Sequence, residues 1–121
     1  MPWNLNSDRP IYTQILEVIK MRIITGVYQP GEKIPSVREL AMQAGVNPNT
    51  MQKALSELER SGLVMAQRTS GRVVTEDMDM IGEVRNNLAK EQVHEFFVRM
   101  QELGYNRQEI MHLLEKEGEH E

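Results

Sequence analysis

The sequence predicts a mainly α-helical protein with a small β-hairpin wing: a winged helix-turn-helix domain followed by a C-terminal α-helical dimerisation hairpin. Two observations carry this prediction. Within residues 35–58, two short amphipathic segments with separate start signals are joined by a tight turn at Gly45. At residues 63–74, two short apolar runs flank a polar, basic segment. In 121 residues, this order fits one small domain plus an appendage.

Capping residues define the two helices of the motif. Ser36 and Glu39 have capping-box spacing, and Asn47 followed by Pro48 suits an N-cap and a first helical position. Gly45 stands where a helix can end on a left-handed residue. The second helix of such a motif presents its N-terminal residues to the major groove of DNA. The apolar stripes comprise Val37, Leu40, Ala41 and Ala44, and then Met51, Ala54, Leu55 and Leu58.

The elements around the motif follow from periodicity. Isoleucine and valine residues at helical spacing predict a helix over about 10–25, with Asp8 as its cap and Pro10 in its first turn. Trp3 is expected to pack on the body of this domain. The runs 63–65 and 72–74 predict the two strands of a hairpin whose tip is 66–71.

The remaining residues predict two helices that need a partner. Residues 1–75 are expected to form the DNA-binding domain and 76–121 the dimerisation section, with Thr75 as the cap. Over 76–103 the apolar stripe turns by roughly a quarter of a circle. We therefore expect the first half to pack on its own domain and the second half on another subunit. Two helices are too small for a core, so a symmetric homodimer is predicted. Its interface residues are Val93, Phe96, Phe97, Met100, Leu103, Ile110 and Leu114.

Charge is divided unevenly along the chain. The net charge is −4, yet residues 1–75 carry +3 and residues 76–121 carry −7. This asymmetry indicates a front that faces nucleic acid and a back turned away from phosphate. An ordinary solvated acidic helix at the C-terminus is the alternative interpretation.

Other classes of function lack their signals. There is no cysteine, no secretion signal and no apolar run of the ~20 residues that span a bilayer, so we expect a soluble cytoplasmic protein. His94, His112 and His120 include no pair four residues apart, so no metal or other cofactor is expected. The sequence contains no phosphate-binding loop and no nucleophile elbow, so we do not expect an enzyme. A small-molecule effector is allowed for, without a cluster that indicates its identity.

A series of spaced residues follows one family pattern along the first part of the chain. These residues are Pro10-Ile11-Tyr12, Gln14-Ile15, Gly26, Pro30-Gly31, Ile34-Pro35-Ser36, Arg38-Glu39-Leu40-Ala41, Gly45-Val46-Asn47, Thr50, Ala54-Leu55, Leu58-Glu59, Gly62-Leu63-Val64 and Gly71. Together they resemble the N-terminal DNA-binding domain of the GntR family of bacterial transcription regulators. The resemblance covers about 10–75, and the short C-terminal section is similar to the YtrA-type branch of the family.

The resemblance implies a role for individual residues. Arg38 would contact a base edge, and its planar guanidinium matches the O6 and N7 atoms of guanine; a surface pair with Glu39 or Glu57 is the alternative. Lys53 would bind phosphate or guanine. Some relatives carry arginine where Pro48 and Gln52 stand here, which implies fewer direct guanine contacts in this chain. The expected DNA-binding residues are Ser36, Arg38, Asn47, Asn49, Thr50, Gln52, Lys53, Arg68, Thr69 and Gly71.

These observations together predict a dimeric, sequence-specific transcription regulator that binds double-stranded DNA at an inverted repeat. The resemblance further implies a repressor of a transporter-type operon. The alternative is a helical protein-interaction module on a winged-helix scaffold without DNA specificity.

Overall fold

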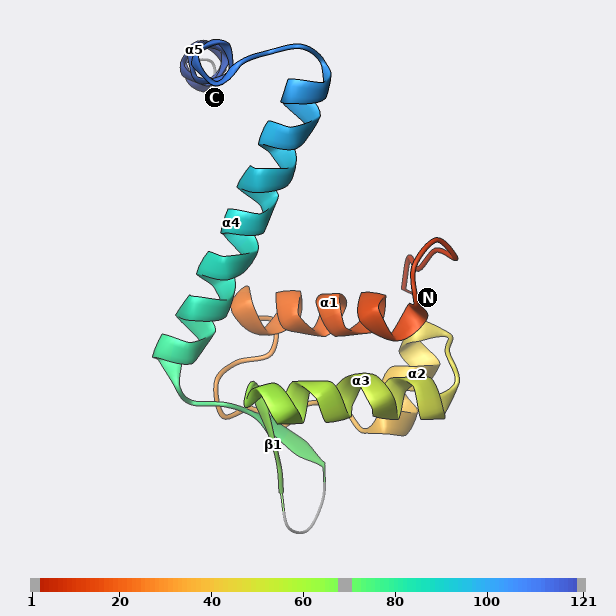
Figure 1. Cartoon of the computed structure of the whole chain (residues 1–121). Coiled ribbons are helices and arrows are strands. Elements are labelled where there is room, and N and C mark those ends of the chain that lie inside the picture. The colour runs from red at the N-terminus through yellow and green to blue at the C-terminus, as the bar shows by residue number, and fades with distance from the viewer. Residues whose placement is uncertain (1–2, 68–70, 120–121) are drawn as a thin grey trace. The chain divides into compact units, whose positions relative to one another are not determined.

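The fold is described for residues 3–67 and 71–119 of a computed structural model (Figure 1). The order of elements confirms the predicted class: helices, a two-stranded hairpin and two further helices. The chain divides into two compact units, Met1–Glu83 and Val84–Glu121, which are considered separately. The elements are α1 (Ile11–Ile24), α2 (Val37–Ala44), α3 (Pro48–Ser61), β1 (Val64–Ala66), β2 (Arg72–Val74), α4 (Met78–Glu102) and α5 (Arg107–Gly118).

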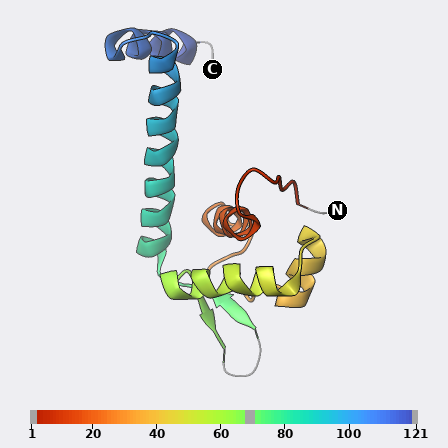
Figure 2. The same ribbon diagram turned by 45° about the vertical axis from the view of Figure 1, so that its right-hand side comes forward.

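The core of the first unit forms where α1 and α2 pack against α3. Most residues of their predicted apolar stripes are buried, which removes a continuous face of each helix from water, while Val37 is half-buried. In Figures 1 and 2, α1 lies on one side of α3 and the hairpin on the other. This places α3 between two flanking elements. The fully buried side chains here include Ile15, Ile19, Leu40, Met51, Leu55 and Leu58.

The start of α1 differs from the prediction. Pro10 occupies the N-cap position without a side-chain cap, so the proposed Asp8 cap is wrong. Instead the buried amide of Gln14 holds the N-terminal segment: Nε2 donates to the carbonyls of Asn6 (2.8 Å) and Arg9 (3.0 Å), and Oε1 accepts from the Asn6 N–H (2.9 Å). A buried amide that is fully paired in this way avoids the cost of an unsatisfied polar group.

Trp3 belongs to the same N-terminal segment. Its ring is half-buried, and the Arg22 guanidinium lies 4.6 Å from the ring centroid. This contact confirms that Trp3 packs on the body of the first unit.

The hairpin is antiparallel, with Val64 opposite Val74 and Ala66 opposite Arg72. Its first strand begins one residue later than predicted. The carbonyl of Leu63 still accepts a hydrogen bond from the Thr75 N–H, which continues the register of the hairpin beyond the strand.

The start of α4 also differs from the prediction, because Asp77 and not Thr75 caps it. Asp77 Oδ1 accepts from the Met80 N–H at 3.1 Å, while the Thr75 hydroxyl accepts from the Asp77 N–H.

The first turns of α4 belong to the first unit, as expected for the first half of that helix. Ile81 is buried, and the side chain of Met80 lies beside Gly62, 3.1 Å from where a Cβ would stand. The compact first unit extends to Glu83.

The second unit contains the rest of α4 and α5. Asn106 and Glu109 form a capping box at the start of α5. Phe96 and Phe97 meet edge to face, with 5.9 Å between ring centroids. Ile110 is the fully buried side chain among the residues of this unit that the structure describes.

Candidate nucleic-acid interface

The start of α3 presents polar side chains to solvent. Asn47 caps the helix by accepting a hydrogen bond from the Asn49 N–H at 2.7 Å, and Pro48 follows at a position where a missing N–H is tolerated. Asn49, Gln52 and Lys53 are exposed. The opposite face of α3 lies in the core, so its orientation is set by burial. Except for the half-buried Thr50, the residues predicted to contact DNA at this helix are exposed.

The start of α2 contributes Arg38. Ser36 and Glu39 form the predicted capping box, with the Glu39 N–H donating to Ser36 Oγ at 3.1 Å. Arg38 is exposed and forms no ion pair with any residue that the structure describes. Glu57, one of its alternative partners, pairs with Arg60 at 3.3 Å. The guanidinium of Arg38 is therefore available for an external acceptor.

The hairpin is joined to α3 by a charged contact. Nε of Arg72 on β2 donates to Oε1 of Glu59 on α3, and the Arg72 side chain is only 13% exposed. A partly buried pair of this kind fixes the hairpin beside the helix more firmly than an exposed pair would. The sequence pattern did not indicate this contact, because it joins residues of two separate elements.

The wing tip is described only in part. Gly71 is exposed and left-handed (φ 68°), and a Cβ at this position would lie 3.0 Å from Lys33 Cε. The stem of Lys33 thus passes beside the wing, which adds a cationic residue that the sequence analysis missed. Arg68 and Thr69 lie outside the described residues.

A further contact missed by the sequence analysis joins α1 to α3. Lys53 Nζ lies 4.1 Å from the centroid of the Tyr12 ring, within the range of a cation–π interaction. Tyr12 was part of the family pattern, but a pattern of spaced residues does not show which side chains meet.

The arrangement has the parts that DNA recognition needs. Amides on α3 can pair with the hydrogen-bonding edge of adenine, and Arg38 can pair with guanine. Cations lie on both sides of α3, where sugar–phosphate backbones border a major groove.

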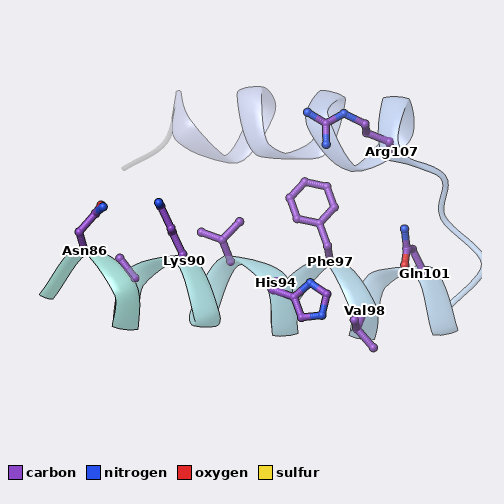
Figure 3. A pocket seen from close by; sticks show the side chains of 9 residues that line it. Asn86, Lys90, His94, Phe97, Val98, Gln101 and Arg107 are labelled. Atoms are coloured by element: carbon purple, nitrogen blue, oxygen red, sulfur yellow. The ribbon is translucent and has the colours of Figure 1, made fainter. Parts of the chain in front are cut away.

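The second unit has an open groove of about 620 Å³ along α4 and the start of α5 (Figure 3). Val93 and Phe97 supply apolar surface, while Lys90, His94 and Arg107 supply nitrogen donors; no carboxylate lines it. In Figure 3, Phe97 points toward α5, and the Arg107 guanidinium lies 5.7 Å from its ring centroid. The groove is therefore lined by apolar side chains together with nitrogen-bearing ones.

The residues predicted for the dimer interface differ in their exposure. Val93 is 55% exposed, Leu103 72% and Leu114 43%, whereas Phe96, Phe97 and Met100 are half-buried. Ile110 is fully buried within its own chain, so it offers no surface to a partner. The expected position of Ile110 in the interface is therefore corrected: its side chain fills the small core of the second unit.

Two other kinds of site are absent from residues 3–67 and 71–119. No group of three histidine, cysteine or carboxylate side chains in these ranges is placed to hold a metal ion; His120 lies outside them. No helix in these ranges combines the length and the apolar character that a membrane crossing requires.

Sequence comparison matches residues 11–74 to the family described as bacterial regulatory proteins, gntR family. The chain is 40% identical over 105 residues to the uncharacterized HTH-type transcriptional regulator YhcF of Bacillus subtilis (strain 168), covering 87% of each chain. It is also 39% identical over 93 residues to the HTH-type transcriptional repressor YtrA of the same strain, covering 76% of this chain and 72% of YtrA.

Comparison with solved structures gives the same family. A GntR family transcriptional regulator from Listeria monocytogenes superposes with a TM-score of 0.84 at 38% identity, covering 93% of this chain and 98% of that one. The AraR DNA-binding domain in complex with operator ORE1 matches 59% of this chain and 89% of that one, with a TM-score of 0.54 at 36% identity.

Proposed function

Because the chain belongs to the GntR family of bacterial regulatory proteins and is a DNA-binding transcription regulator rather than an enzyme, we propose that it acts as a dimeric repressor. It binds an inverted-repeat operator through the start of α3, Arg38 on α2 and the wing. The carrying observation is the exposed start of α3, which a buried apolar face holds outward. Its site of action is the cytoplasm, where bacterial DNA lies.

Direct base recognition rests on few side chains. Arg38 pairs with guanine, and Asn49 and Gln52 pair with base edges, since these residues are exposed and have matching donors and acceptors. The related AraR domain was solved with its operator, which supports the same use of the fold. Contacts to phosphate come from the remaining predicted residues, Ser36, Asn47, Thr50, Arg68, Thr69 and Gly71.

A second copy of the chain occupies the groove of the second unit. Charge complementarity between this groove and α5 supports a second copy as the partner. The groove is lined by Lys90, His94 and Arg107 and by no carboxylate. On α5, Met111 and Leu114 are exposed and Glu115 follows on the same face. In a two-fold arrangement each α5 places these apolar side chains in the groove of the other copy. The interface then includes Val93, Phe96, Phe97, Met100, Leu103 and Leu114.

Repression requires only that the bound dimer exclude other proteins from a promoter. The relative YtrA carries the name of a repressor, which supports this direction of control. The resemblance to YtrA-type regulators is also what supports a transporter-type operon as the target.

Selection of bound fragments from a pool of random duplex DNA tests the proposal. We expect enrichment of an inverted repeat whose half-sites lie one helical turn apart, about 10 base pairs, or a multiple of it. In transcription from a promoter that contains the selected sequence, added protein should lower the yield of transcript. Enrichment of a single half-site would contradict the dimer, and no enrichment would contradict sequence-specific binding. A rise in transcript would contradict repression.

A further inference from the structure

The exposed face of α3 has two flanks with different neighbours. Successive residues of a helix are about 100° apart, so Gln52 and Lys53 lie on opposite sides of the line through Asn49. Gln52 shares its side with Glu59, two turns further on, and Glu59 binds Arg72 of the wing. Lys53 lies on the other side, where its ammonium contacts Tyr12 of α1. Gln52 and Lys53 therefore point toward different walls of the DNA major groove that α3 is proposed to enter.

The Tyr12 ring restricts where the Lys53 ammonium can lie. Nζ is 4.1 Å from the ring centroid, close enough for attraction to the face of the ring. Lysine otherwise samples many rotamers, and fixing them on binding costs conformational entropy. The contact holds the charge at the α1 flank before DNA arrives. Lys53 nevertheless remains exposed, so its other N–H groups can reach an acceptor.

We propose that Tyr12 is a positioning residue that holds Lys53 for a backbone phosphate on the α1 side of the recognition helix. This inference rests on the proposed DNA binding, and it assigns Lys53 to phosphate instead of guanine. A lysine ammonium is a compact point charge that suits a phosphate oxygen. A side chain held at the flank of a helix faces the sugar–phosphate wall of the major groove, whereas the centre faces base edges. Lys53 thus contributes affinity without sequence preference.

A double-mutant cycle on the full-length protein tests the assignment, with the selected operator and a random duplex of equal length titrated at several salt concentrations. Lys53→Met should weaken binding to both duplexes by the same factor and reduce the salt slope by about one. Tyr12→Leu should weaken binding about two- to fivefold, which matches an exposed cation–π contact. In the Lys53→Met background it should have no further effect. Tyr12→Phe keeps the ring and should bind like the wild type.

The control variant is Lys20→Met, which removes the same charge from α1 two turns after Tyr12 and should change binding less than Lys53→Met. Thermal unfolding followed by circular dichroism checks that Tyr12→Leu is folded; if it is not, Tyr12→Val is used in its place. A loss confined to the operator in Lys53→Met would overturn the phosphate assignment. The positioning role would be overturned if Tyr12→Leu weakened DNA binding equally in the wild-type and the Lys53→Met backgrounds. It would also be overturned if Tyr12→Leu did not change DNA binding at all. Failure of the wild type to bind any duplex would instead refute the proposed function.

Discussion

The two compact units of this chain cover their own apolar residues to very different extents. Among the described residues, sixteen of the seventeen buried apolar residues lie in the first unit, and Ile110 is the exception in the second. Both units also expose large apolar residues, but in the second unit these outnumber its one buried apolar residue: they are Val93, Val98, Leu103, Tyr105, Met111 and Leu114. Apolar area left in water is apolar area that a partner can cover. The first unit therefore has an apolar core of its own, and the proposed dimer would cover the apolar surface of the second unit.

The difference does not arise from weaker local signals in the second unit. Both units contain a helix that begins with a complete capping box, at Ser36 and at Asn106. A capping box satisfies backbone donors at a helix start, but it buries no core. What separates the units is the number of elements that meet: α1, α2 and the hairpin all contact α3, whereas the described part of the second unit has two helices, α5 and the portion of α4 from Val84 onward.

The largest effect should come from charge placed on the open surface of the second unit. In Val93→Glu, a side chain that is 55% exposed in the single chain would bring a carboxylate into the proposed interface. Burial of one valine is worth about 1.5–3 kcal/mol, and a change at a two-fold interface counts twice. We expect dimerisation to weaken at least about 100-fold, measured by sedimentation equilibrium.

The matched control is Val27→Glu, because Val27 is a 62% exposed valine of the first unit. It should leave the dimer intact. If Val93→Glu and Val27→Glu both sediment like the wild type, Val93 lies outside the interface.

A smaller effect, limited to DNA, should follow from Arg38→Ala. Arg38 is exposed and has no ion pair among the described residues, so neither folding nor dimerisation should change. Loss of a bidentate contact to guanine should cost about 1–3 kcal/mol per half-site and relax the preference at one base pair. Titration of the operator and of operators changed at single base pairs measures both. An equal loss on random DNA would mean that Arg38 binds only phosphate.

The smallest effects should come from the two capping boxes, and they should differ in where they are measured. Removal of a side-chain cap costs about 0.5–2 kcal/mol. Ser36→Ala should lower the free energy of unfolding of the first unit, followed by the fluorescence of Trp3. Asn106→Ala loosens α5 and should weaken the dimer, measured by sedimentation. Ser7→Ala, an exposed serine outside any helix, is the control.

The proposed difference between the two units would be refuted if Ser36→Ala and Asn106→Ala both changed only the unfolding of the first unit. In that case α5 would contribute nothing to assembly, and the surface of the second unit would need another occupant.

Much of the fold and part of the site could be predicted from local rules. Helix starts at Ser36, Asn47 and Asn106 follow from side chains that reach amides three residues away or fewer, so the sequence alone indicates them. The exposed edge of α3 follows from its apolar stripe in the same way. The Asp8 and Thr75 caps were wrong because several polar residues precede each of those helices, and only the backbone path selects one.

Contacts between elements could not be predicted from the local rules of capping and periodicity. The pairs Tyr12–Lys53 and Glu59–Arg72 join residues from different elements, and no spacing in the sequence encodes which side chains meet. The burial of Ile110 could not be predicted from local rules either. Periodicity placed Ile110 on an apolar face, but only packing shows that its own chain covers that side chain.

The helices, the hairpin and the exposed start of α3 follow from residues close in the chain, and the family follows from a series of matching positions. Three features come only from the packing of the elements: α1 and the wing flank α3 on opposite sides, the first unit ends at Glu83, and Ile110 is internal. Capping and periodicity act within a few residues, whereas burial depends on which elements share a surface.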